Sequence, residues 1–342
     1  MKPYTTHYKE LFRLGLPIII GQIGIIFVSF ADTIMVGQHG TDDLGAASFV
    51  NNMFNLAIIF ATGFSYGLTP IVGKLFGSDK RREIGCTLKN ALLANSAIAL
   101  LLIAVMGVLY LNIGNLGQPE ELLGLMRPYY IVLLITMPFI TLFNAFKQFS
   151  DGITDTLTPM YILLGGNLLN IFGNWLLIYG NWGFPEMGLL GAGIATLVSR
   201  IVMLLVFFAL FLCARRYRPY KEGFMTSRVN VKDSRALYKM GMPVGLQMGM
   251  ETASFSLSTI MVGWLGTMAL EAHQVMITVG QLGFMMYYGM AAAVAVKAGY
   301  HHGRGEMQGV SENVSAGFRI ILVMAAMVCI PLFIFRSQIG FL

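Results

Sequence analysis

The sequence predicts an all-α integral membrane protein built as a duplicated helical bundle. Hydrophobic residues make up 56% of its 342 residues and charged residues only 12%, whereas soluble domains carry roughly 25% charge. The apolar residues gather in runs near the roughly 20 residues that a membrane-spanning helix needs. The segment Thr33–Gly37 also recurs unchanged as Thr259–Gly263. Duplicated hydrophobic bundles are typical of secondary transporters.

Nine spanning helices are predicted. We place them at 12–36, 46–74, 88–110, 127–149, 158–180, 187–213, 237–263, 269–298 and 314–335. A strongly basic stretch follows the sixth span and marks a linker between two lobes. The chain is therefore predicted to contain an N-terminal lobe of six helices (1–213), a cytoplasmic linker (214–236) and a partial C-terminal lobe of three helices (237–342).

The repeat has an offset of 259 − 33 = 226 residues. The same offset pairs Pro17 with Pro243 and Gly73 with Gly299, with no gap between the copies. Six spans precede the linker, so both copies enter the membrane the same way up and are related by an axis along the membrane normal. The repeat predicts twelve helices, of which the last three have no counterpart in this sequence.

Lysine and arginine residues collect in the loops on one side of the predicted spans. That side includes the N-terminus and the linker, whereas the opposite loops carry several acidic residues. The positive-inside rule then places the N-terminus in the cytoplasm, with the chain crossing a bacterial-type inner (plasma) membrane several times. Because this topology accounts for the net charge of +6, we expect no nucleic-acid partner.

Two acidic residues, Asp32 and Glu251, lie well inside apolar spans. A charge at the bilayer centre costs about 2.5–3.5 kcal/mol on insertion scales. Such a residue needs a water-filled cavity, a bound cation or a proton. Both acids are therefore candidate coupling sites, and the alternative is that one of them forms an ion pair with Arg200, deep in the sixth span.

Other polar residues share helix faces in the same lobe. Asn170 and Asn174 are four residues apart, as are Thr196 and Arg200, so each pair lies on one face of its helix. Buried amides either bond neighbouring helices or line a wet cavity, and the spacing leaves both possibilities open. Pro17 removes one backbone hydrogen bond from the first span and permits a bend there.

Asp151 and Asp155 lie in a predicted short loop after the fourth span. Their spacing resembles that of the acids in membrane enzymes that bind a metal-diphosphate. A helix-joining turn is the simpler interpretation, because Gly152 and Pro159 are close by.

Several motifs together resemble the multidrug and toxic compound extrusion (MATE) family in its NorM-like branch. They are Gly15–Pro17, Ala31–Gly37, Thr156–Met160, Gly191–Thr196, Gly241–Pro243 and Gly245–Gln247. The resemblance implies twelve helices in two six-helix lobes, alternating access, and efflux of organic cations in exchange for Na⁺ or H⁺. It implies no enzyme activity and no cofactor.

The resemblance also assigns residues. Asp32 matches the acid of the first helix, and Asn170, Asn174 and Thr196 match a polar cavity in the first lobe. Glu251 matches an acid of the seventh helix, here a weak Na⁺ ligand, and Pro17 matches a proline at a helix bend. The expected partners are cationic drugs or dyes and membrane lipid, and the full-length protein is expected to be a monomer. Two alternatives remain, a flippase of a related fold for lipid-linked saccharides and a Mg²⁺-dependent membrane enzyme using Asp151 and Asp155.

Overall fold

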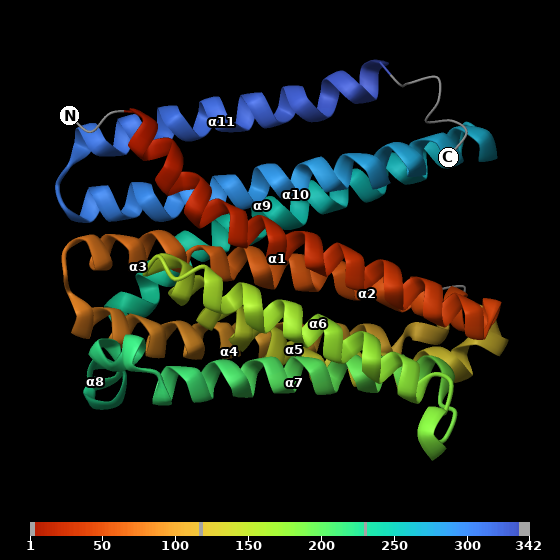
Figure 1. The fold of residues 1–342 in the computed structure, drawn as a ribbon. Coiled ribbons are helices and arrows are strands. Elements are labelled where there is room, and N and C mark those ends of the chain that lie inside the picture. Colours follow the sequence, from red (N-terminus) through yellow and green to blue (C-terminus); the bar gives the residue numbers. More distant parts are fainter. Residues whose placement is uncertain (1–3, 116–118, 229–230, 335–342) are drawn as a thin grey trace.

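The computed structural model describes residues 4–115, 119–228 and 231–334, and this part of the chain forms helices and turns without a strand (Figure 1). Its α-helices are α1 (Tyr4–His39), α2 (Thr41–Tyr66), α3 (Leu68–Gly77), α4 (Arg81–Leu111), α5 (Glu120–Gly152), α6 (Leu157–Leu177), α7 (Gly188–Cys213), α8 (Arg218–Thr226), α9 (Val231–Gly263), α10 (Thr267–Gly303) and α11 (Met307–Ile334). Three short 3-10 helices are η1 (Ile113–Asn115), η2 (Asn181–Gly183) and η3 (Arg215–Tyr217). Helices are expected in lipid because they satisfy every backbone polar group internally.

Within the described residues, eight helical segments are long and apolar enough to cross a membrane. They correspond to eight of the nine predicted spans, with α2 and α3 forming one segment. The remaining prediction, 237–263, falls in α9, a helix of 33 residues. Gln247, Glu251 and several hydroxyl side chains make α9 more polar than the other eight segments. Each predicted span overlaps a long helix, so the all-α multi-pass membrane fold is confirmed.

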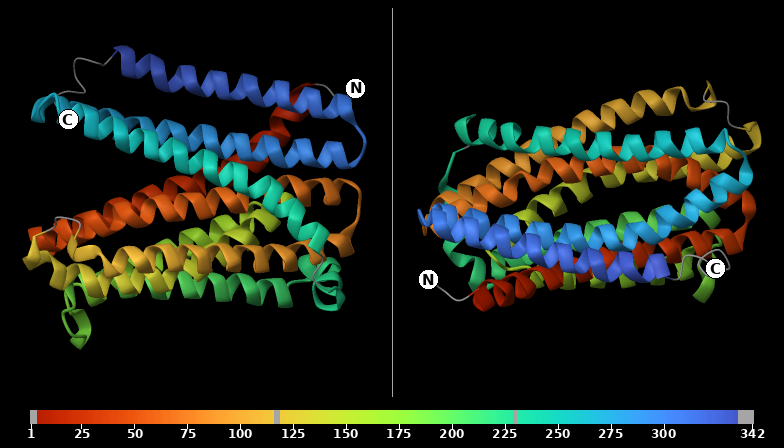
Figure 2. Two further views of the ribbon diagram at one scale, coloured as in Figure 1. Left: turned by 180° about the vertical axis from the view of Figure 1, so that it is seen from behind. Right: turned by 90° about the horizontal axis from the view of Figure 1, so that it is seen from above.

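The helices of the two sequence repeats form two groups. Helices α9–α11 lie together on one side of the molecule, and α4–α7 lie on the other (Figures 1 and 2). The first half of α1 joins the opposite group, because Leu11 and Ile18 are buried with Met290 of α10 and Ile320 of α11. The second half of α1 returns to pack on α6. A single helix therefore connects both groups.

Helix α9 makes the reciprocal crossing. Its early residues Tyr238 and Met242 pack against Phe64 of α2 and Ile98 of α4. The 226-residue offset relates the first turns of α9 to those of α1. The repeat in the sequence is thus also a repeat in the packing between the groups.

The two groups approach most closely along a seam of glycines. A Cβ on Gly77 would lie 2.0 Å from the carbonyl oxygen of Tyr300, and one on Gly303 would lie 2.0 Å from that of Lys74. These are the same contact made twice, since 77 + 226 = 303 and 74 + 226 = 300. Small residues allow helix backbones to approach this closely in membranes. The other glycines of this seam are Gly15, Gly63, Gly67, Gly73, Gly241, Gly245, Gly289 and Gly299.

The basic linker folds back on the first-repeat helices. Within it, η3 and α8 pack beside α4 and α7. A Cβ on Gly85 of α4 would lie 2.0 Å from the carbonyl oxygen of Tyr220 in α8. Tyr217 and Tyr220 are buried in the same hydrophobic cluster as Phe149 and Phe211, which anchors the linker to the bundle.

Candidate functional site

Asp32 of α1 contacts an amide of α6. The Nδ2 of Asn174 donates a hydrogen bond to Oδ1 of Asp32 at 2.5 Å. Asn174 is fully buried, while Asp32 is half-buried. A hydrogen bond to the charged form of a carboxyl group stabilises that form.

The polar cluster continues from α6 to α7. Nδ2 of Asn170 donates to Oγ1 of Thr196 at 3.1 Å, and Nδ2 of Asn174 also lies 3.5 Å from Oδ1 of Asn170. The structure therefore brings together Asp32, Asn170, Asn174 and Thr196, the four residues that the resemblance assigned to a polar site in the first lobe. Asn174 Oδ1 is buried and has no hydrogen-bond partner within the described part of the chain. The cluster thus retains an unused oxygen acceptor.

Arg200 follows Thr196 by one turn of α7, but its guanidinium points to a different partner. Its Nη1 donates to Oγ1 of Thr136 in α5 at 2.6 Å. Among the ion pairs of the described residues, none joins Arg200 to Asp32, so the predicted alternative of a simple pair is not formed here. The flippase hypothesis also gains no support, because the deep guanidinium is engaged with a neighbouring helix.

Sequence reasoning missed Thr136, Tyr129 and Asn51. The Tyr129 hydroxyl donates to Oδ1 of Asn51 at 3.0 Å, and Tyr129 is close enough to interact electrostatically with Asp32 and Arg200. Hydroxyl and amide residues are common in spans, and the spacing within one helix does not show which of them face another helix.

Glu251 lies apart from this cluster. It is on α9, in the second-repeat group, and its side chain is exposed. The structure therefore does not bring Asp32 and Glu251 into one site. Their two environments are different, since Asp32 contacts amides and Glu251 faces open space.

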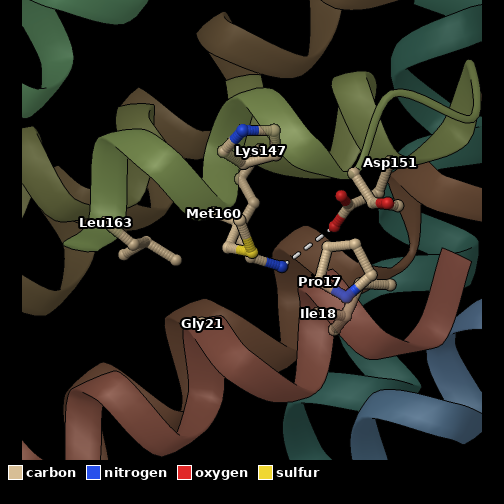
Figure 3. Close-up of a pocket in the computed structure, with 9 residues that line it drawn as sticks. Pro17, Ile18, Gly21, Lys147, Asp151, Met160 and Leu163 are labelled. Atoms are coloured by element: carbon tan, nitrogen blue, oxygen red, sulfur yellow. Dashed lines mark hydrogen bonds and ion pairs between the residues drawn. The ribbon is translucent and has the colours of Figure 1, made fainter. Parts of the chain in front are cut away.

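Pro17 lies inside α1, which continues helically through it. Figure 3 shows its ring in a narrow pocket beside Lys147 and Asp151 of α5 and Met160 of α6. Lys147 Nζ donates to Oδ2 of Asp151 at 2.9 Å, and both side chains are buried. The sequence had placed Asp151 in a loop, but α5 extends to Gly152 and includes it. That prediction was wrong because the ion pair allows the apolar helix to continue past two charged residues.

Asp155 is held by different partners. Its Oδ2 accepts hydrogen bonds from Arg216 Nη1 at 2.6 Å and from the Tyr217 hydroxyl at 2.8 Å. The hydrogen bond to Asp155 raises the pKa of Arg216, and burial raises the pKa of Tyr217 to about 12. Asp151 and Asp155 thus face separate cations. No group of three or more metal-ligating side chains forms within the described residues.

Comparison with known proteins agrees with this architecture. The family described as MatE matches residues 17–176 and 243–342. A probable multidrug resistance protein NorM of Photorhabdus laumondii is 29% identical over 330 residues, covering 96% of this chain and 72% of the relative. The multidrug resistance protein NorM of Vibrio cholerae is 28% identical over 342 residues, covering 100% of this chain and 75% of that protein.

Solved structures show the same fold. The eukaryotic MATE transporter AtDTX14 superposes with a TM-score of 0.87 at 15% identity, covering 98% of this chain and 74% of its own. A multidrug resistance MATE family transporter in an outward-facing conformation gives a TM-score of 0.80 at 22% identity, covering 97% and 73%. The sequence relatives are described as multidrug resistance proteins, and the solved structures as MATE transporters. The chain, with its repeated helical groups and matched family segments, belongs to the MatE family of multi-pass membrane transporters.

Proposed function

We propose that this transporter is a secondary active antiporter that exports organic cations, such as cationic drugs and dyes, in exchange for Na⁺ or H⁺. Its two lobes would alternate access to the two sides of the membrane, without a cofactor. The names of the NorM relatives, which are multidrug resistance proteins, support the substrate class. We also propose that the two lobes, residues 1–213 and residues from 237 onward, are the parts of the protein that move relative to each other.

The observation that carries the proposal is the Asp32 cluster. A carboxylate in an apolar span needs a compensating proton, cation or hydrogen bond. Asn174 supplies one hydrogen bond, and its own Oδ1 is left unused. Carbonyl and carboxylate oxygens coordinate Na⁺ in transporters, and a carboxyl group can alternatively take up a proton. Asp32 can therefore exchange an ion for a cationic substrate, and Asn170 and Thr196 hold the amide in place.

Glu251 is proposed as a second coupling acid with weak affinity for Na⁺. Its side chain is exposed, and it takes part in none of the ion pairs found among the described residues. Carboxylate oxygens are suitable ligands for Na⁺, and a single carboxylate holds the ion only weakly. The role of Pro17 as a bending point of α1 is likewise a proposal, supported by its missing backbone N–H.

The orientation proposal rests on where the basic residues lie. Helix α8, the turn between α3 and α4, and the turn between α10 and α11 lie at the same end of the bundle as the N-terminus (Figure 1). That end carries Lys74, Lys80, Arg81, Arg82 and Arg304. The positive-inside rule makes it cytoplasmic, in the inner membrane of a bacterial-type cell. We also propose that the transporter works as a monomer surrounded by lipid.

The test is ethidium resistance in an efflux-deficient bacterial host. We expect Asp32→Asn to reach the membrane at normal levels and to lose resistance, because the neutral amide can neither release a proton nor balance a cation. Asp42→Asn, an exposed acid at the start of α2, is the matched control and should retain resistance. Wild-type resistance from Asp32→Asn would remove Asp32 from the mechanism. Everted vesicles energised with a Na⁺ or a pH gradient then identify the coupling ion.

A further inference from the structure

The basic linker is fastened to the end of α7 by its own side chains. Lys221 of α8 donates from Nζ to the carbonyl oxygen of Leu212 at 3.1 Å, and Leu212 is the second-last residue of α7. The last carbonyls of a helix lack partners within the helix, so this contact satisfies one of them. Tyr217 of η3 is fully buried and donates to Asp155 at 2.8 Å. The linker therefore lies directly against the end of a membrane-spanning helix.

These contacts leave two arginines of the linker pointing outward. Arg215 and Arg218 are exposed on either side of the buried Tyr217. Arg218 continues η3 with helical backbone angles (φ −51°, ψ −40°), and residues three apart lie on the same side of such a turn. Arg216 pairs with Asp155 at 2.6 Å, whereas neither Arg215 nor Arg218 belongs to an ion pair found among the described residues. We call Arg215 and Arg218 the arginine pair.

An apolar surface of α7 leads up to the arginine pair. Helix α7 runs along the outer edge of the first-repeat helices, and α8 lies at its end (Figure 1). No charged residue occurs between Arg200 and Arg215 in the sequence. The exposed side chains just before the end of α7 are all apolar, and we call them the apolar strip: Leu205, Val206, Phe208, Ala209 and Leu210. The surface thus changes from apolar to doubly positive within a few residues.

We propose that the arginine pair and the apolar strip together bind one anionic phospholipid, from the leaflet at this end of the bundle. The guanidinium groups hold the phosphate oxygens of the headgroup, and an acyl chain covers the apolar strip. A planar guanidinium matches phosphate oxygens with two parallel N–H donors. Basic residues directly beside a spanning helix attract anionic lipid. The inference goes beyond the proposed function, because it depends on neither the exported substrate nor the coupling ion.

Charge decides which phospholipid fits. A zwitterionic headgroup brings an ammonium group close to the two guanidinium groups, whereas an anionic headgroup brings only the phosphate charge. Glu222 follows Arg218 by four residues on α8 and is also exposed. Residues four apart lie on one helix face, so this carboxylate opposes the binding of a phosphate. The site should therefore prefer anionic lipid, and removal of Glu222 should strengthen the preference.

The experiment measures lipid binding to the delipidated full chain by native mass spectrometry, with dioleoyl phosphatidylglycerol as the probe. We expect Arg215→Gln and Arg218→Gln each to raise the Kd about fivefold, the contribution of one basic residue at an anionic surface, and the double variant to raise it roughly 25-fold. Arg127→Gln removes an exposed arginine near the start of α5, at the other end of the bundle. This charge-matched control should bind phosphatidylglycerol as the wild type does.

Two further ligands separate the sources of the phosphate. Dioleoyl phosphatidylcholine should bind more weakly to the wild type and should be insensitive to the double variant. Glycerophosphoglycerol, the soluble headgroup without acyl chains, should bind far more weakly than the lipid, because it cannot cover the apolar strip. Equal Kd values for the two lipids would overturn the proposal. Headgroup binding as tight as that of the lipid would show a phosphate site without a lipid and would overturn it as well.

A gain in binding keeps the test independent of misfolding. We expect Glu222→Gln to lower the phosphatidylglycerol Kd about twofold, the scale of one charge contact between neighbouring turns of a helix. Weaker binding by this variant would contradict contact between the phosphate and the arginine pair. A wild-type Kd in the double variant would show that the arginine pair does not hold the headgroup.

Discussion

At the scale of single residues, the acids inside and beside the bundle differ in their partners. Lys147 and Asp151 neutralise one another in a buried pair, and Asp155 is satisfied by Arg216 and Tyr217. Asp32 instead contacts a neutral amide. Because Asp32 forms no ion pair among the described residues, it is the acid that we propose for uptake of an ion or proton.

The buried pair gives a prediction about stability. Lys147→Met should lower the free energy of unfolding by about 3–5 kcal/mol, because it leaves the Asp151 carboxylate buried without a partner. The double variant Lys147→Met with Asp151→Asn should recover much of that loss. Thermal melting of the purified protein in detergent measures both. A double variant no more stable than Lys147→Met would contradict this account of the pair.

Tyr217 gives a prediction about pH. Its folded pKa of about 12 lies above the ordinary value of 10.0, so the folded state holds its proton where the unfolded state has lost it. Stability from this group is fully present below pH 10 and should fall as the pH rises from about 10 towards about 12. The melting temperature of the wild type should decline over that range more steeply than that of Tyr217→Phe. Parallel curves for the two proteins would show that Tyr217 is not responsible.

At the scale of helices, close backbone approach decides which glycines are required. Most spans contain glycine. All the seam glycines except Gly15 face another backbone, whereas Gly107 of α4 has no neighbouring heavy atom within 4 Å of an added Cβ. The 226-residue repeat places seam glycines in both copies. The seam is thus the physical reason why glycines recur at equivalent positions.

Two matched substitutions test the seam. Gly303→Ala should lower the melting temperature, because its Cβ would lie 2.0 Å from the Lys74 carbonyl oxygen and force α3 and α10 apart. Gly107→Ala should be neutral or stabilise the protein by about 0.5–1 kcal/mol, as expected for alanine in a helix. The same melting assay compares them. Equal stability of the two variants would mean that the seam tolerates added volume.

At the scale of the whole molecule, the two groups are joined by crossing helices and by side-chain contacts between the α3 end and α10. The Phe76 ring of α3 meets the Tyr300 ring of α10 with centroids 5.8 Å apart, and Ser78 Oγ donates to the Gly303 carbonyl at 2.7 Å. Both contacts lie at the end proposed to be cytoplasmic. Alternating access would require that this end open and close.

A cross-link at that end tests the movement. In a background with Cys86, Cys213 and Cys329 replaced, we expect Phe76→Cys combined with Tyr300→Cys to react with a short bifunctional maleimide, because the two rings have centroids 5.8 Å apart. The linked protein should lose ethidium efflux, because α3 and α10 can no longer separate. Each single cysteine variant treated in the same way is the control. Full efflux by the linked protein would show that transport needs no opening between α3 and α10.

The sequence by itself determined the all-α membrane class, the duplication and the identity of the first-lobe polar residues. These features follow from composition, hydropathy and residue spacing, none of which depends on how the helices pack. Asn170 and Asn174 share a helix face at any packing, since they are four residues apart. Asp32 was identifiable because an acid in an apolar run is expensive in lipid.

The tertiary structure decided which of these residues meet and which do not. It placed Thr136 rather than Asp32 against Arg200, extended α5 through Asp151 and carried the first half of α1 into the opposite group. Hydropathy predicts that a helix lies in the membrane. It does not predict which neighbouring helix each of its faces contacts. That choice depends on side-chain volumes on neighbouring helices, and glycines far apart in the chain let those helices meet at the seam.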